Sequence, residues 1–364
     1  MNKIKAFLAR KGVVCSFRQY GVDALGAMAQ GLFCTLLVGT ILNTLGQQLH
    51  IGFLTAPVVS VGTVSYTVGG LASAMVGPGI AVAIGTALHC PPLVLFSLIP
   101  VGFAANAMGG AGGPLAVYAV TIIAAELGKL VSKETRIDIL VTPCVTVIAG
   151  IAVAQLIAAP IGTAARAVGL AIIWATELQP FFMGVLVSAL IGIALTLPIS
   201  SAAICAAFGL TGLAGGAAVA GCCAQMVGFA VMSFKENRWG GLVAQGVGTS
   251  MLQMPNILKN PRIWIPPTLA SMITGPLATC VFKLQMNGSP VSSGMGTCGF
   301  VGQIGVYTGW VSDIAAGTKA AITPMDWIGL VLICFILPAV LSTLFCRVLE
   351  KRGWIREGDM KLDL

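Results

Sequence analysis

Long apolar runs separated by short basic stretches dominate this chain. Residues 24–125 contain no Asp, Glu, Lys or Arg. In a soluble domain, a run of that length would leave a large apolar patch on the surface. The apolar runs reach the length of about 20 residues that a spanning helix needs, and they lack the alternation of a transmembrane β-barrel strand. The pattern therefore predicts an all-α polytopic membrane protein.

Hydropathy and breaks along the chain predict about eight transmembrane helices plus two re-entrant hairpins. The predicted spans are 21–48, 55–76, 79–108, 113–132, 138–161, 180–198, 265–283 and 327–347. The third is interrupted at Cys90-Pro91-Pro92 and is expected to form two half-helices, because proline disfavours a continuous helix.

Basic residues predict the orientation of these spans. They cluster at the N-terminus, at 129–136, at 235–238, at 259–262 and in the tail from Arg347. Cytoplasmic loops carry such an excess of Lys and Arg, so both termini are expected in the cytoplasm. Residues 1–20 are predicted to form an amphipathic helix on the cytoplasmic membrane surface.

The same charge pattern predicts where the chain turns back inside the bilayer. Residues 200–234 are apolar throughout, yet they must begin and end on the cytoplasmic side. A re-entrant hairpin with its tip in GLTGLAGG (209–216) satisfies this condition, and two thin crossings would as well. Residues 287–310 are too polar and glycine-rich for a span, and we expect them to form a second hairpin that enters from outside.

The two halves of the chain differ in polar content, which predicts a division of labour. Residues 21–161 carry few polar groups and are expected to form a scaffold or dimerisation half. Residues 162–347 hold buried-looking polar residues, prolines and both hairpins, and are expected to form a transport half. Residues 348–364 would be a cytoplasmic tail.

Composition agrees with lipid as the solvent. The chain of 364 residues is 57% hydrophobic and 9% charged, whereas a soluble domain carries about 25% charged residues. Its 46 glycines are typical of helices that approach closely in lipid. The net charge of +8 is explained by membrane topology rather than by nucleic acid. The eleven cysteines show no CxxC or metal spacing, so we expect no metal site and no cofactor.

A carboxylate directly before the sixth span is the first candidate for a solute site. Glu177 and Gln179 lie in WATELQPFFMG, where Pro180 frees backbone carbonyl groups. A carboxylate at membrane depth indicates function. The alternative is an interfacial Glu favoured by the dipole of the following helix.

A polar stripe in GTSMLQMPNILKNPRIWIPP (248–267) is the second candidate. Helical spacing places Ser250, Gln253 and Asn256 along one face. Neutral donors and acceptors of this kind suit a hydroxyl-rich ligand better than a metal. The alternative is an amphipathic cytoplasmic helix that ends near Lys259.

The predicted second hairpin adds Thr297 and Gln303 on a glycine-rich backbone, although serine-rich segments of this kind also form solvated turns. His89, just before the Pro-Pro break, and Asn106 are weaker candidates for the same solute site. A lone histidine there more often has a structural role.

Catalytic motifs are missing from the sequence. It contains no Walker-type GxxxxGK[ST], no HExxH, no nucleophile elbow and no EF-hand loop. We therefore expect no enzyme, but a transporter, or a membrane sensor, driven by something outside the chain.

Four stretches resemble a known family. They are TLPISSAA (196–203), GLAGGAAVAGCCAQMVGFAVMSFKEN (212–237), GTSMLQMPNILKNPRIWIPPT (248–268) and GMGTCGFVGQIG (294–305). They resemble the IIC-type sugar permeases of the bacterial phosphotransferase system, in the branch that includes the perfringolysin O regulator. The resemblance runs from about residue 20 to residue 350.

This resemblance implies a homodimer in the bacterial cytoplasmic membrane with an IIC-like elevator architecture, moving a small polar, carbohydrate-like solute. It also implies a separate IIB-type partner, because this chain has no hydrophilic stretch long enough for that domain. Thr176-Glu177-Leu178-Gln179-Pro180 looks like the TEP-like motif of the wider superfamily, but two residues separate its carboxylate from its proline. The alternative function is a ligand-sensing regulator of gene expression without net transport.

Overall fold

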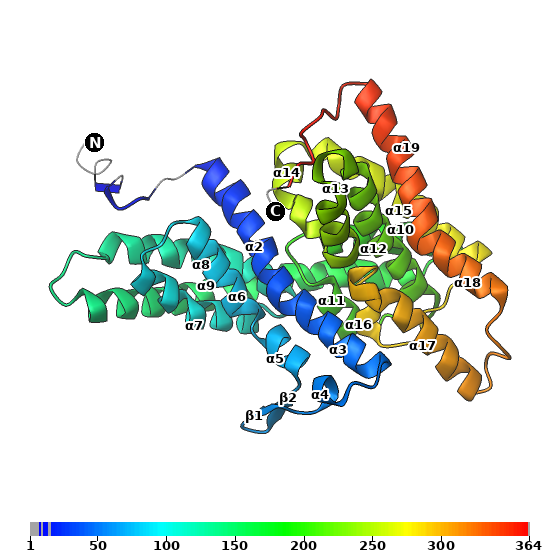
Figure 1. Ribbon diagram of the computed structural model, residues 1–364, viewed down its shortest axis with the longest axis horizontal. Coiled ribbons are helices and arrows are strands. Elements are labelled where there is room, and N and C mark those ends of the chain that lie inside the picture. Colours follow the sequence, from blue (N-terminus) through cyan, green and yellow to red (C-terminus); the bar gives the residue numbers. More distant parts are fainter. Residues whose placement is uncertain (1–6, 9, 14–15, 363–364) are drawn as a thin grey trace. The chain divides into compact units, whose positions relative to one another are not determined.

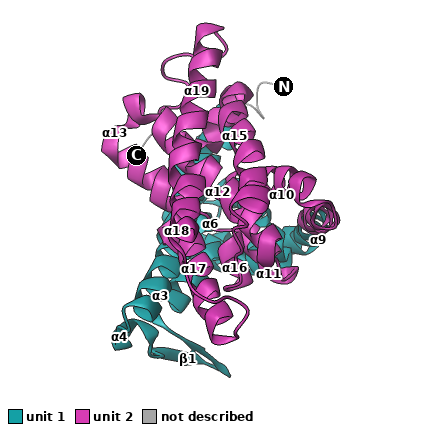
Figure 2. Cartoon of the chain, turned by 90° about the vertical axis from the view of Figure 1, so that its right-hand side faces the viewer, with its two compact units in different colours: residues 1–164 teal, residues 165–364 magenta. Residues whose placement is uncertain are grey.

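The computed structural model describes residues 7–8, 10–13 and 16–362, and it divides the chain into two compact units. Unit 1 comprises Met1–Ala164 and unit 2 comprises Ala165–Leu364 (Figure 2). The division falls within one long helix, α9. The predicted surface helix over residues 1–20 lies partly outside the described residues, so its first turns are not described.

Helices make up nearly all of unit 1. Its elements are η1 (Arg18–Ala24), α2 (Leu25–Leu32), η2 (Phe33–Leu37), α3 (Val38–Gln48), α4 (Gly52–Thr55), β1 (Val59–Val61), β2 (Val64–Tyr66), α5 (Val68–Ala74), α6 (Val76–Ala87), α7 (Pro92–Gly109), η3 (Gly110–Gly112), α8 (Gly113–Val131) and α9 (Asp138–Thr176). The last of these continues into unit 2.

Unit 2 is helical (Figure 1). Two of its segments, residues 201–232 and 287–315, each hold a short helix followed after a turn by a longer one, and we call them the first and the second hairpin. Its elements are α10 (Pro180–Thr196), α11 (Ser201–Ala207), α12 (Gly212–Met232), α13 (Phe234–Val243), η4 (Ala244–Gly248), η5 (Ser250–Gln253), α14 (Met254–Lys259), η6 (Pro261–Trp264), α15 (Ile265–Pro276), η7 (Leu277–Val281), α16 (Pro290–Ser293), η8 (Cys298–Phe300), α17 (Val301–Ala315), α18 (Pro324–Val331), η9 (Leu332–Ile336) and α19 (Leu337–Lys351).

Several helices are long and apolar enough to cross a bilayer, which confirms the predicted all-α polytopic class. In the described part of the chain there are five, or six if α5 and α6, bent by 54°, form one span. The five are Arg18–Gln48, Pro92–Val131, Asp138–Thr176, Gly212–Met232 and Pro324–Lys351. The segment Pro92–Val131 contains α7 and α8, which pack against each other.

Two predicted spans have different bounds in the structure. The span predicted over 55–76 is not one helix, because β1 and β2 form an antiparallel hairpin there with Val59 opposite Tyr66. Its alternating Val-Ser pattern favours strands, and Gly62, with φ +61°, makes the turn. The span predicted to end at residue 161 continues to Thr176, past Pro160. Prolines are tolerated in membrane helices.

The break predicted at Cys90-Pro91-Pro92 is present. Helix α6 ends at Ala87, and α7 begins at Pro92, where the missing N–H costs no hydrogen bond. His89 stands in the intervening turn with φ +53°. This turn separates two half-helices that pack side by side.

A buried ion pair fixes the end of α8 within unit 1. Lys129 Nζ lies 2.9 Å from Glu126 Oε1 and donates to the carbonyl oxygens of Gly12 and Leu88. Lys129 is 2% exposed. A buried ammonium needs such partners to offset its desolvation, so this pair has a structural role, as its i,i+3 spacing predicts.

Helix α12 is the central helix of unit 2. Its span is 94% buried, and it packs against α10, α15 and α19. Before it stands the short α11, and residues 208–211 make the turn with Gly209 at φ +60°. The turn thus lies at the beginning of the predicted tip. Helix α12, which follows this turn, has 21 residues. At the usual rise of a helix it extends about 31 Å, which suffices to span the bilayer core.

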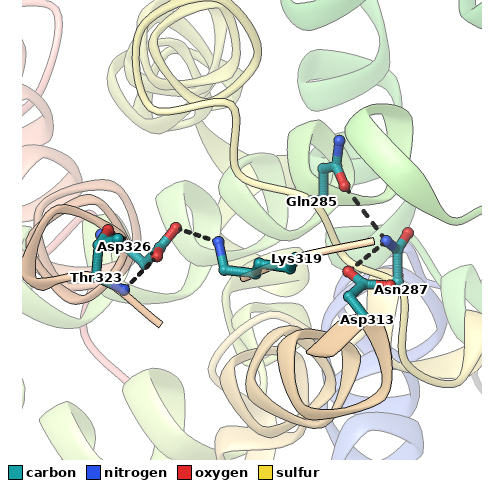
Figure 3. Close-up of polar contacts among 6 residues, drawn as sticks. All are labelled: Gln285, Asn287, Asp313, Lys319, Thr323 and Asp326. Carbon is teal, nitrogen blue, oxygen red and sulfur yellow. Dashed lines mark hydrogen bonds and ion pairs between the residues drawn. The ribbon is translucent and has the colours of Figure 1, made fainter. Parts of the chain in front are cut away.

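The second hairpin is anchored where α12 begins. Met286 pairs with Gly212 in an isolated antiparallel bridge, and Asn287 Oδ1 accepts from the Gly212 N–H at 3.1 Å. Asn287 Nδ2 also donates to Asp313 Oδ2 at 2.8 Å, which joins the beginning of the hairpin to the last turn of α17 (Figure 3). Nearby, Lys319 forms an ion pair with Asp326 at 2.9 Å, also drawn in Figure 3. The base of the hairpin is therefore held on the first turn of α12.

Candidate functional site

Three chain segments meet at the middle of α12, around residues 222–226. The first is the end of α10, where Thr196 Oγ1 lies 3.3 Å from Gln225 Oε1. The second is the turn of the second hairpin, residues 294–300, where Thr297 Oγ1 lies 3.5 Å from Met226 Sδ. The third is η5, which follows the C-terminal end of α12 by way of α13 and η4 and contacts Thr196 through Ser250. We call that end of unit 2, which carries the bases at 235–238 and 259–262, the basic end.

A chain of neutral polar groups links two of these segments. Ser250 Oγ and Thr196 Oγ1 are 2.8 Å apart, and Thr196 reaches Gln225. Gln225 Oε1 also accepts from Trp264 Nε1 at 3.0 Å, and Gln225 Nε2 donates to Thr268 Oγ1 at 3.1 Å. Thr196, Gln225 and Ser250 are each 0% exposed. A fully satisfied buried network of this kind fixes its members rigidly.

Removing the Thr196 hydroxyl should show how much this network contributes to the stability of the fold. Thr196→Val keeps the shape but leaves Ser250 and Gln225 each short of one partner. We expect the free energy of unfolding to fall by about 1–2 kcal/mol, measured by thermal unfolding in detergent. Thr196→Ser, which keeps the hydroxyl, is the matched control. Equal melting temperatures for the two variants would show that the hydroxyl contributes nothing.

The turn of the second hairpin and the first turn of α17 carry polar groups with poor partners. Thr297 Oγ1 donates to the thioether of Met226 at 3.5 Å, and Gln303 Nε2 donates to Cys223 Sγ at 3.2 Å. Gln303 Oε1 is buried and has no hydrogen-bond partner among the residues that the structure describes. Sulfur is a weak acceptor, and an unpaired buried acceptor costs about 1–3 kcal/mol. These groups would gain from a ligand that offers hydroxyl groups.

Close backbone contact sets the position of this turn. A Cβ on Gly296 would lie 2.6 Å from the Cβ of Cys222, and Gly296 has φ +53°, which glycine adopts without strain. Ser201 Oγ donates to the Gly294 carbonyl oxygen at 2.7 Å, which connects the first hairpin to the second. The two hairpins therefore hold Thr297 against α12.

Other residues predicted from the sequence lie elsewhere. Glu177 and Gln179 are exposed in the turn between α9 and α10. The 17 residues of α10 separate this turn from Thr196, and a helix of that length extends about 25 Å. The structure thus brings Ser250, Thr297 and Gln303 to the middle of α12 but leaves Glu177 and Gln179 at the far end of α10.

Gln253 and Asn256 share the predicted face, but they bind the tail of the chain. Gln253 Nε2 donates to the Met360 carbonyl oxygen and to Gln245 Oε1, both at 2.9 Å. Asn256 Nδ2 donates to Gln253 Oε1 and to the Lys361 carbonyl oxygen. Their hydrogen-bonding capacity is thus used within the protein.

The two weaker candidates both belong to unit 1. His89 is exposed in the turn before α7, and Asn106 is half-buried on α7. Asn106 lies close to Gly113, whose Cβ position would be 2.4 Å from Asn106 Oδ1. Its tight fit against glycine indicates packing in this unit.

Sequence reasoning missed Thr196 and Gln225 as site residues. Gln225 is the only strongly polar side chain in the 21 residues of α12, and that isolation is a usable signal because polar groups are rare within membrane helices. Thr196 offered no such signal, since threonine is common in apolar helices, where its hydroxyl bonds to a backbone carbonyl group.

The chemistry of the site is neutral. Around the middle of α12 the polar groups are amides and hydroxyls, which donate and accept without charge. No group of three or more His, Cys, Asp or Glu side chains suited to a metal occurs in the described residues. The arrangement is suited to a neutral polyhydroxyl solute.

Comparison with known families decides the class. The family described as Phosphotransferase system, EIIC, matches residues 22–362. The chain belongs to this family. No curated protein matches it. No solved structure matches it.

Membership of the EIIC family assigns a general role. EIIC proteins are the membrane permease components of bacterial sugar phosphotransferase systems, so the chain is a multi-pass protein of the bacterial inner membrane. They are transporter components that are not catalytic on their own. The family also implies a sugar as substrate and a IIB-type protein as a possible partner.

Proposed function

We propose that this EIIC protein moves a neutral carbohydrate-like solute past the middle of α12 by elevator-type alternating access. Unit 2 would be the moving half and unit 1 the scaffold of a homodimer. The basic end of unit 2 would face the cytoplasm, and the basic residues near the N-terminus predict the same side for that terminus by the positive-inside rule.

The observation that carries this proposal is the buried Gln303 Oε1, which has no partner among the described residues, together with the Thr297 hydroxyl, which donates to a thioether. Broken helices around a midplane site are common in transporters. Here Thr297 contacts Met226 and Gln303 contacts Cys223, on the same part of α12 that carries Gln225. Hydroxyl groups of a sugar would supply the partners that sulfur atoms now supply poorly.

Glu177 and Gln179 enter the proposal in a different role. Their turn stands at the end of α10 away from the basic end, so these polar groups would meet a solute at the outer entrance. Gln253, Asn256, His89 and Asn106 have no part in the solute site that we propose.

A solute screen tests the proposal. Purified protein should melt at a higher temperature with one class of monosaccharide or polyol and not with charged metabolites of equal size. A ligand at 100 times its Kd stabilises the folded state by about 2.7 kcal/mol. A screen in which only acids or bases raise the melting temperature would contradict a neutral site. Unchanged uptake with altered transcription after gene deletion would favour the sensing alternative.

A further inference from the structure

The C-terminal tail does not leave the fold after α19. We call residues 353–362 the strap, because they cross the basic end of unit 2 and return to α14 (Figure 1). Ile355 and Met360 of the strap are each 2% exposed. A solvated tail has no reason to bury two apolar side chains, so the strap is part of the packed structure.

Side chains from the start of α13 hold the strap by its backbone. The two carboxylate oxygens of Glu236 accept from the N–H groups of Gly358 and Met360 at 2.9 and 3.0 Å. Asn237 donates to the Met360 carbonyl oxygen and accepts from the Leu362 N–H, both at 2.8 Å. Residues 357–360 form a turn, with Gly358 at φ +95°, so these two side chains hold a turn of the strap by its backbone.

The last residue of η5 and the segment that follows it hold the other side of the strap. Gln253 and Asn256 donate to the carbonyl oxygens of Met360 and Lys361. Asn260 Nδ2 donates to the Trp354 carbonyl oxygen at 3.0 Å and to Asp359 Oδ2 at 2.7 Å. The guanidinium of Arg262 stands 5.2 Å from the centre of a Trp354 ring. The strap thus joins α13 to the connector between η5 and α15.

Helix η5 connects the strap to the proposed site. Ser250, its first residue, contacts Thr196, and Gln253, its last, binds the strap. One 3₁₀ turn, about 6 Å, separates them. Both residues are 0% exposed. Any movement of η5 away from α10 must therefore break the contacts with the strap or carry the strap along.

We propose that a route to the middle of α12 opens at the basic end, and that the strap is a built-in latch that holds η5 closed over this route. Its release opens this route from the cytoplasmic side, and its return closes it. The latch rests on the proposed function only for the nature of the solute that would use this route. The latch itself is a property of the fold, and its state can be measured without any solute.

Thiol labelling at position 250 tests the latch. Ser250→Cys places a small reporter on η5, and a polar maleimide is applied to purified protein without sugar. Truncation after Arg352 should raise the labelling rate at position 250 at least tenfold. Glu236→Gln, which keeps the shape but replaces one of the two acceptor oxygens with an NH2 donor, should raise it less. Labelling is read on the peptide that contains position 250, so the native cysteines do not interfere.

The same variants with a cysteine at Thr135, in the exposed charged loop between α8 and α9, provide the control, and labelling at position 135 should be the same in each of them. If the truncated protein does not fold, Asn237→Ala with Glu236→Gln loosens the strap in the full-length chain. A labelling rate at position 250 that stays within twofold in a folded, monodisperse variant would overturn the latch. Loss of sugar binding with intact gating would overturn the proposed solute site alone.

Discussion

Gly221→Val is expected to cause a large loss of stability in unit 2. A Cβ at Gly221 would lie 1.9 Å from the carbonyl oxygen of Ser188 on α10. Since the obstacle is backbone, no side chain can rotate away. We expect a loss of about 3 kcal/mol, the upper end of overpacking costs, and a fall in melting temperature of roughly 6–12 °C, measured in detergent.

This position is sensitive because α10 is clamped between two glycine contacts. A Cβ on Gly275 of α15 would lie 2.1 Å from the Gly184 carbonyl oxygen. Small residues let membrane helices approach to backbone contact. Helix α10 therefore cannot shift away from α12 without pressing on α15, and valine at position 221 must separate the helices.

Gly240→Ala provides the matched control for this prediction. Gly240 is exposed on α13, and a Cβ there would meet no atom within 4 Å. Alanine favours a helix over glycine by up to about 1 kcal/mol, so the control should melt at the same or a slightly higher temperature. A Gly221→Val protein that melts with the control would show that the close contact between α10 and α12 does not exist in solution.

Local sequence signals predicted much of the fold. The Pro-Pro break before α7 and the polar second hairpin followed from proline and glycine chemistry. The span predicted over 55–76 was wrong, because hydropathy alone does not distinguish the exposed Val-Ser alternation of β1 and β2 from a helix. The long α9 also exceeded its predicted end, since proline does not always stop a membrane helix.

The site was harder to predict because its partners are distant in sequence. The spacing of Gln253 and Asn256 correctly indicates a shared polar face, but nothing local reveals that the face meets the distant Met360. Charges in the tail indicated a solvated end, whereas the contacts are made by its backbone. Gln225 was missed because mean hydropathy averages over its apolar neighbours. Its single amide nevertheless makes all the hydrogen bonds from the middle of α12 to Thr196, Trp264 and Thr268.

Gln303→Leu is expected to separate solute binding from stability. Within the described part of the chain, the Gln303 amide oxygen has no partner and its NH2 group has one weak sulfur partner. Leucine of similar volume removes the unpaired acceptor, so the melting temperature should stay equal or rise. Affinity for the stabilising sugar should fall at least tenfold, about 1.4 kcal/mol, measured by isothermal titration calorimetry.

Ser188→Ala is the control, because it should lower stability and leave sugar affinity unchanged. Ser188 is 0% exposed and donates to the Ser271 carbonyl oxygen at 2.7 Å, so its hydroxyl is well paired within the helix bundle. Its loss should lower stability by about 1 kcal/mol and leave sugar affinity unchanged. A Gln303→Leu protein that loses stability while binding sugar normally would make Gln303 a structural residue. In that case the under-partnered amide would reflect packing around Cys223 rather than a place kept for a solute hydroxyl.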